Sequence, residues 1–222
     1  MNGQEATVKP VIDKKAAEIV ATGSFSETAA AAGGIAITII ALAGVLPTLL
    51  AGIAAIVTGA ALLMEGGAVA AKMAGEIAHE ESRAEMAELT GGLTSEFIAG
   101  AAGVVLGILA LIGIAPMTLL AVAAVTFGGG LVMGAMVTTE LRHVQVAASP
   151  ATYARHGIER AVSAANGVRA LFGFGAVALG ILALNYSPTS LVLSLVAYLV
   201  VSVSVLLSGS TVGAKMVSAL RH

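Results

Sequence analysis

The chain has 222 residues, of which 58% are hydrophobic and 11% are charged, whereas soluble domains carry about 25% charged residues. So few charges cannot cover the surface of a globule this size, and this excludes a soluble monomer. The net charge of −2 excludes a basic nucleic-acid-binding surface, so we expect no nucleic acid as a partner. The lack of cysteine excludes disulfides, thiolate nucleophiles and Cys-ligated metals.

Three long segments carry no charged side chain, residues 28–64, 97–139 and 170–214. A helix crosses the apolar core of a bilayer with about 20 residues, so each segment is long enough for two spans. Near the middle of each lies a proline, which lacks a backbone N–H and therefore indicates a tight turn; these prolines are Pro47, Pro116 and Pro188. The sequence predicts an all-α integral membrane protein in the lipid bilayer, with six transmembrane helices arranged as three repeated helical hairpins.

The predicted spans and the segments between them account for the whole chain. The spans cover residues 29–46, 48–71, 97–115, 117–139, 170–184 and 189–213. The resulting order is an N-terminal arm (1–28), hairpin 1 (29–71), an acidic connector (72–96), hairpin 2 (97–139), a basic connector (140–169), hairpin 3 (170–214) and a tail (215–222). The acidic connector is rich in Ala and Glu and is predicted to be helical. Within the basic connector, a break at Ser149-Pro150 precedes a predicted surface helix over residues 153–168.

The positive charges are distributed unevenly along the chain. All eleven Lys and Arg residues lie in the arm, the two connectors and the tail, and the short turns carry none. Cytoplasmic loops of membrane proteins are enriched in Lys and Arg. We therefore expect a multi-pass protein with both termini and both connectors in the cytoplasm.

Short sequence matches recur in the three predicted hairpins in the same order. Gly-Ile-Leu-Ala-Leu occurs at residues 107–111 and 180–184, with a looser match at 38–42, and a turn proline follows each within four or five residues. The residues that precede the hairpins also correspond: Ser26-Glu27, Ser95-Glu96 and Val168-Arg169. The hairpins are therefore predicted to be copies of one unit.

With its paired apolar helices, Gly-Ile-Leu entry, turn proline and glycine-bearing second helix, this unit resembles the repeat of the HdeD family. These are small six-span bacterial membrane proteins linked to acid stress. The resemblance implies a prokaryotic cytoplasmic (inner) membrane location and a stress-related role. It implies no catalytic residues.

Glu65 is the charged residue closest to a membrane interior in the predicted topology. An ionisable residue within a span is a candidate proton or ion site. However, Glu65 follows Pro47 by eighteen residues, which is about 27 Å along a helix and places it near the cytoplasmic end. The interpretation as an interfacial carboxylate is therefore favoured, and by alignment the other two units have Gly134 and Ser208 at this position.

Two Glu-x-x-His pairs follow the second and fourth spans, Glu76 with His79 and Glu140 with His143. Such pairs on separate helices resemble the ligands of carboxylate-bridged di-metal sites in bundles. Solvated charge at a membrane surface explains the same residues, and this interpretation is favoured over a metal site. We expect no cofactor.

Small residues at helical spacing are abundant, among them Gly34, Gly103, Gly107, Gly130 and Gly134. Such spacing is typical either of a specific helix-dimer seam or of close packing within one bundle. Packing within the chain is favoured. A homo-oligomer is expected on a separate ground, because so small a bundle has few internal faces to bury.

Nothing in the sequence indicates an enzyme, because the serines within the spans have no His or Asp at the same depth. The spans also lack the polar and ionisable residues that line most ion and solute pathways. We therefore predict a structural or stress-related membrane protein that acts through self-association or as a membrane subunit of a complex with a membrane or cytoplasmic partner. The alternative is a small channel or transporter for a neutral or weakly polar solute.

Overall fold

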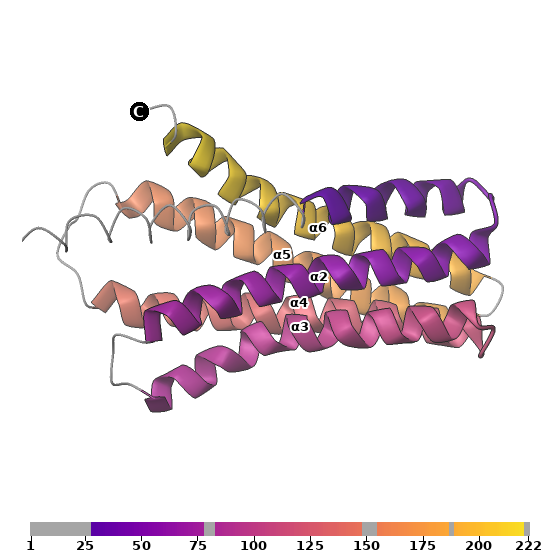
Figure 1. Ribbon diagram of the computed structural model, residues 1–222, viewed down its shortest axis with the longest axis horizontal. Coiled ribbons are helices and arrows are strands. Elements are labelled where there is room, and N and C mark those ends of the chain that lie inside the picture. Colours follow the sequence, from indigo (N-terminus) through magenta and orange to yellow (C-terminus); the bar gives the residue numbers. More distant parts are fainter. Residues whose placement is uncertain (1–27, 78–82, 148–154, 187–188, 220–222) are drawn as a thin grey trace, which may run out of the picture.

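The computed structural model describes residues 28–77, 83–147, 155–186 and 189–219. Every regular element in this part of the chain is a helix, so the predicted all-α class is confirmed (Figure 1). The helices are a first one at Thr28–Leu42, α2 at Pro47–Ile77, α3 at Arg83–Leu111, α4 at Pro116–Ala147, α5 at Arg155–Asn185 and α6 at Ser190–Ala219.

Four of these helices are long and apolar enough to cross a membrane. The qualifying segments are Pro47–Gly67, Pro116–Met136, Gly167–Asn185 and Ser190–Ser208. The apolar parts of the first helix and of α3 are shorter, at Thr28–Leu42 and Ser95–Leu111. Large hydrophobic side chains remain exposed on the outside of the bundle, including Ile98, Ile112 and Leu171. The protein therefore has the helices and the outer surface of a membrane-embedded protein.

The helices extend beyond the predicted spans into the connectors. α2 and α3 both reach into the acidic connector, and α5 runs without interruption from Arg155 to Asn185. The helix predicted over residues 153–168 is present from Arg155, but it forms the first part of α5 and is not separate from the span that follows. No proline occurs between residues 155 and 185, so the ladder of backbone hydrogen bonds continues across the point where the composition changes from polar to apolar.

Pro47 and Pro116 are the first residues of α2 and α4. A proline is favoured there, because the first N–H groups of a helix have no partner within the helix and the fixed φ of proline suits the helix. The two turns that precede these prolines lie at the same end of the bundle (Figure 1). Pro188 lies outside the described residues.

The turns before α2 and α4 have the same backbone geometry. Gly44 and Gly113 have φ of 89° and 91°, and Leu46 and Ala115 have φ of 40° and 38°. Both pairs occupy the left-handed region, which glycine adopts without strain. The main-chain hydrogen bonds correspond too, as in Ala43 N–H to Ile39 O and Ile112 N–H to Ile108 O.

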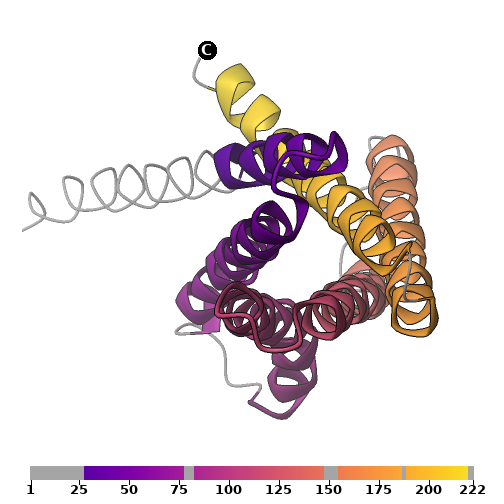
Figure 2. The same ribbon diagram turned by 90° about the vertical axis from the view of Figure 1, so that its right-hand side faces the viewer.

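The second helix of each predicted hairpin lies at the centre of the bundle. α2, α4 and α6 contact one another, α3 packs between α2 and α4, and α5 packs between α4 and α6. The first helix lies beside α6 and α2 in the end-on view of Figure 2, and its Gly34 contacts Ser202 and Thr58 of those helices. Central and peripheral helices therefore alternate around the bundle.

Pairs of glycines let central and peripheral helices approach closely. A Cβ atom added at Gly59 of α2 would lie 2.7 Å from the carbonyl oxygen of Gly100 of α3. One added at Gly128 of α4 would lie 2.5 Å from the carbonyl oxygen of Gly173 of α5. Small residues at such crossings allow the backbone contact that holds helices together in lipid.

Large side chains fill the centre of the bundle. Phe127 of α4 and Tyr198 of α6 pack edge to face, with ring centroids 5.7 Å apart. The Tyr198 hydroxyl donates a 2.6 Å hydrogen bond to the carbonyl of Leu120, and the Phe127 ring lies against Gly103 of α3. Further fully buried side chains surround these two, namely Leu62, Leu131, Leu195, Val201 and Val205.

Candidate functional site

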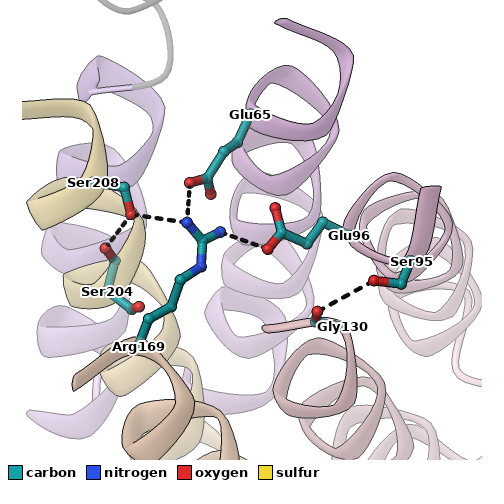
Figure 3. A network of polar contacts seen from close by, with 7 residues as sticks. All are labelled: Glu65, Ser95, Glu96, Gly130, Arg169, Ser204 and Ser208. Atoms are coloured by element: carbon teal, nitrogen blue, oxygen red, sulfur yellow. Dashed lines mark hydrogen bonds and ion pairs between the residues drawn. The ribbon is translucent and has the colours of Figure 1, made fainter. Parts of the chain in front are cut away.

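Arg169 of α5 lies between two glutamates from different helices (Figure 3). Its Nη1 donates to Oε1 of Glu65 on α2 at 2.6 Å, and its Nη2 lies 2.8 Å from Oε1 of Glu96 on α3. Ion pairs at these distances are charge-assisted and short. We call the side chains of Glu65, Glu96 and Arg169 the Arg169 cluster. Two carboxylates and one guanidinium give it a formal net charge of −1.

The Arg169 cluster is withdrawn from solvent. The side chains of Glu65, Glu96 and Arg169 are 7%, 5% and 17% exposed. Across the residues that the structure describes, Oε2 of Glu65 is a buried oxygen that finds no hydrogen-bond partner. A buried charge is costly unless it is paired, and a buried polar atom is costly unless it is hydrogen-bonded.

Two further helices shape the site. Arg169 Nη1 donates to Oγ of Ser208 on α6 at 3.2 Å, and that hydroxyl donates to the carbonyl of Ser204 at 2.9 Å, so Ser208 faces Arg169 with a lone pair. Gly134 of α4 lies against the carboxylate of Glu96, where any side chain would occupy the same space. The Arg169 cluster therefore draws its three side chains from α2, α3 and α5, and α4 and α6 border it.

The spacing from the prolines explains why these residues meet. Glu65 follows Pro47 by 18 residues and Glu96 precedes Pro116 by 20 residues. At 1.5 Å per residue both lie about 27 to 30 Å from the turn end of the bundle. The same depth on antiparallel helices brings the two glutamates together.

The sequence contains a pattern that predicts this ion-pair cluster, although Glu65 was interpreted without reference to it. Glu96 and Arg169 occupy corresponding positions before the second and third predicted hairpins. Opposite charges at equivalent depths in neighbouring units indicate an ion pair, because an ionisable residue at membrane depth needs a partner. Glu65 is the third member, and the structure places it inside the bundle rather than on its outer surface.

A second polar contact lies deeper in the bundle. The hydroxyls of Thr58 on α2 and Ser202 on α6 are 3.1 Å apart, and both side chains are fully buried. Thr38 and Ser194 instead donate to carbonyls one turn earlier in their own helices. These hydroxyls satisfy one another or the backbone.

The five glycines singled out from the sequence all lie against another helix of the same chain. Gly34 faces Ser202 and Thr58, Gly103 faces Phe127, and Gly107 faces Ile56 and the carbonyl of Gly52. Gly130 faces Ala99, and Gly134 faces Glu96. These positions serve helix packing within one chain.

The structure does not describe the side chains of the four predicted metal ligands. His79 lies outside the described residues, as do the side chains of Glu76, Glu140 and His143. Within the described part of the chain, no group of three His, Asp or Glu side chains is arranged to hold a metal ion.

No protein-family model, curated protein or solved structure matches this chain. The function therefore rests on the geometry of the bundle and of the Arg169 cluster.

Proposed function

We propose that the chain forms a six-span bundle of three related hairpins in a prokaryotic cytoplasmic membrane, with both termini in the cytoplasm. The matching turns before α2 and α4 support this architecture, and so do the alternating central and peripheral helices. The glycine crossings between α2 and α3 and between α4 and α5 also correspond. The architecture is the one that the resemblance to the HdeD family implies.

Within this architecture the protein acts as a structural, non-enzymatic membrane component, through self-association or as the membrane subunit of a complex. The observation that carries this proposal is the filled centre of the bundle. Phe127 and Tyr198 pack against each other in the interior, Phe127 also against α3 and Tyr198 against α4, and both belong to the buried apolar core of the bundle. Such an interior favours packing over conduction, because conducting proteins expose polar groups or broken helices near the midplane.

The second candidate is a small channel or transporter for a neutral or weakly polar solute. The buried Thr58 and Ser202 hydroxyls favour it, because they are polar groups at the contact of two central helices. A pathway along the centre would require Phe127 and Tyr198 to move together, and that movement would break the Tyr198 hydrogen bond to Leu120.

Two measurements on the full chain test the structural proposal. Native mass spectrometry after gentle extraction is expected to show a homo-oligomer, or a complex with another membrane protein, carrying lipid and no metal. Stopped-flow shrinkage of liposomes in glycerol and in urea is expected to match protein-free liposomes. Solute entry that rises with the amount of reconstituted protein would reject the structural proposal and support the channel.

A further inference from the structure

A groove on the outer surface of the bundle runs between α3 and α4. Its volume is about 430 Å³, within the range of about 300 to 1,000 Å³ that small-molecule sites occupy. Ile98 of α3 and Met133 of α4 line it and are 63% and 61% exposed, so the groove opens outward rather than into the core. The rest of the lining consists of Ser95, Ala99, Thr126, Gly129 and Gly130.

Two neighbouring glycines of α4 create the hollow. Gly130 brings α4 close to α3, because a Cβ atom added there would lie 2.5 Å from the Cβ atom of Ala99. A Cβ atom added at Gly129 would meet nothing within 4 Å. The missing side chain of Gly129 therefore leaves space on the outer surface, and Ile98 and Met133 border this space from the two helices.

The two hydroxyl groups of the lining donate to main-chain carbonyls. Ser95 Oγ donates to the carbonyl of Gly130 at 3.5 Å (Figure 3), and Thr126 Oγ1 donates to the carbonyl of Val122 at 2.9 Å. A hydroxyl has one proton to donate, so neither side chain has a donor left for a ligand. The groove therefore suits an apolar occupant.

The groove lies at the depth of one leaflet. Thr126 and Met133 follow Pro116 by 10 and 17 residues, which places them about 15 and 26 Å from the turn end of the bundle. The hydrocarbon core of a bilayer is about 30 Å thick. The groove therefore extends from the middle of the bilayer toward the surface at the end of the bundle away from the turns.

We propose that this groove binds one acyl chain of a phospholipid from that leaflet. The proposal rests on the six-span arrangement proposed above, because that arrangement places α3 as well as α4 in the bilayer. The terminal methyl group of the acyl chain lies near Thr126, and its glycerol end lies toward Met133. The flexible thioether side chain of Met133 adapts to the bends of the chain, as methionine does at irregular apolar surfaces.

The size of the groove favours an acyl chain over a helix from a second copy of the protein. Thr126 and Met133 are about 10 Å apart along α4, so the volume corresponds to a cross-section of about 40 Å². A helix with its side chains is about 10 to 12 Å in diameter, and its cross-section is therefore about twice as large. A single hydrocarbon chain is narrower and needs no hydrogen-bond partner.

Photolabelling of the full chain in vesicles tests the proposal. The vesicles contain phosphatidylglycerol, phosphatidylethanolamine and a small share of phosphatidylcholine with a diazirine in one acyl chain. A diazirine at the terminal methyl is expected to label the groove near Thr126, and one close to the glycerol is expected to label it near Met133. Labelling there should saturate at one lipid per chain, whereas labelling of Leu171, which is 70% exposed on α5, should rise in proportion to the probe.

Gly129→Leu fills the groove, because its side chain enters space that the structure leaves open. This variant is expected to lose the saturable labelling of Ile98 and Met133. Gly175→Leu on α5 is the matched control, since a Cβ atom there also meets nothing within 4 Å. It makes the same substitution in an apolar helix outside the groove and is expected to label as wild type does.

Four results would overturn the proposal. Labelling of the groove that rises in proportion to the probe, as at Leu171, means that bulk lipid alone touches it, and the six-span arrangement would still stand. Saturable labelling that Gly129→Leu retains would place the lipid elsewhere. No labelling anywhere in residues 95–111 would reject the six-span arrangement and the groove with it. A dimer in native mass spectrometry that Gly129→Leu dissociates and Gly175→Leu does not would assign the groove to a second copy.

Wild type alone decides the outcome if Gly129→Leu does not fold. Saturation at one lipid per chain, together with the exchange of labelled sites between the two diazirine positions, supports the proposal. Labelling by both probes at the same residues, or without saturation, rejects it.

Discussion

Gly134 of α4 lies directly against the carboxylate of Glu96 of α3, in the space that a side chain would fill. Because Gly134 has no side chain, the Glu96 carboxylate has space to pack against α4 and to reach Arg169 on α5. A glycine that the sequence assigns to general helix packing thus also shapes the Arg169 cluster.

Gly134→Ala is expected to displace Glu96 and weaken its ion pair with Arg169. Overpacking of an interior costs about 1 to 3 kcal/mol, so thermal unfolding in detergent should occur at a clearly lower temperature. Gly129→Ala is the control on the same helix, since a Cβ atom there meets nothing within 4 Å. Equal stability of the two variants would show that Glu96 does not need this space.

Arg169→Lys is expected to retain the charge and lose part of the stability. A guanidinium offers separate N–H groups to two carboxylates in a fixed plane, whereas an ammonium is a compact point charge. Arg169→Gln should destabilise further, by about 3 to 5 kcal/mol, because it leaves two buried carboxylates without their cation. Denaturant titration of detergent-solubilised protein ranks the three proteins, and a glutamine variant as stable as wild type would contradict the role of the cluster.

Gly59→Ala is expected to push α2 away from α3. Its Cβ atom would lie 2.7 Å from the Gly100 carbonyl oxygen, and backbone does not yield as a side-chain end does. We expect a loss of about 1 to 3 kcal/mol. Gly67→Ala, eight residues along the same helix, meets nothing within 4 Å and should leave the unfolding temperature unchanged.

Tyr198→Phe removes a buried hydrogen bond without changing the ring. The hydroxyl donates to the Leu120 carbonyl at 2.6 Å, and loss of such a bond costs about 1 kcal/mol. Tyr186→Phe is the control, because Tyr186 is 59% exposed. The difference in unfolding free energy between the two variants measures the contribution of the Tyr198 hydroxyl.

Single cysteines test the orientation in the membrane, since the chain has no cysteine of its own. Val45→Cys lies in the turn before α2, where Val45 is 52% exposed, and Ser218→Cys lies near the end of α6. In intact cells a membrane-impermeant maleimide is expected to label the first variant and to label the second only after permeabilisation. Labelling of both without permeabilisation would contradict a cytoplasmic C-terminus.

Sequence analysis predicted the positions of the helices better than their lengths. α2 and α4 begin at Pro47 and Pro116. A proline has a fixed φ and lacks a backbone N–H in any surroundings, and both properties suit the first position of a helix. A change from polar to apolar side chains does not end a helix, because the backbone hydrogen bonds continue through it. For that reason α5 is one helix where a surface helix and a separate span were predicted.

Composition and hydropathy alone predict the all-α class and the apolar surface of a membrane protein, since hydropathy and backbone hydrogen bonding act over one helix at a time. That Glu65, Glu96 and Arg169 meet in one site follows instead from the packing of the helices. The hydrogen bond from Arg169 to Glu65 joins residues 104 positions apart, and such a contact depends on how each helix is rotated about its own axis. That rotation is set by the packing of glycines and large side chains on neighbouring helices, which no single segment contains.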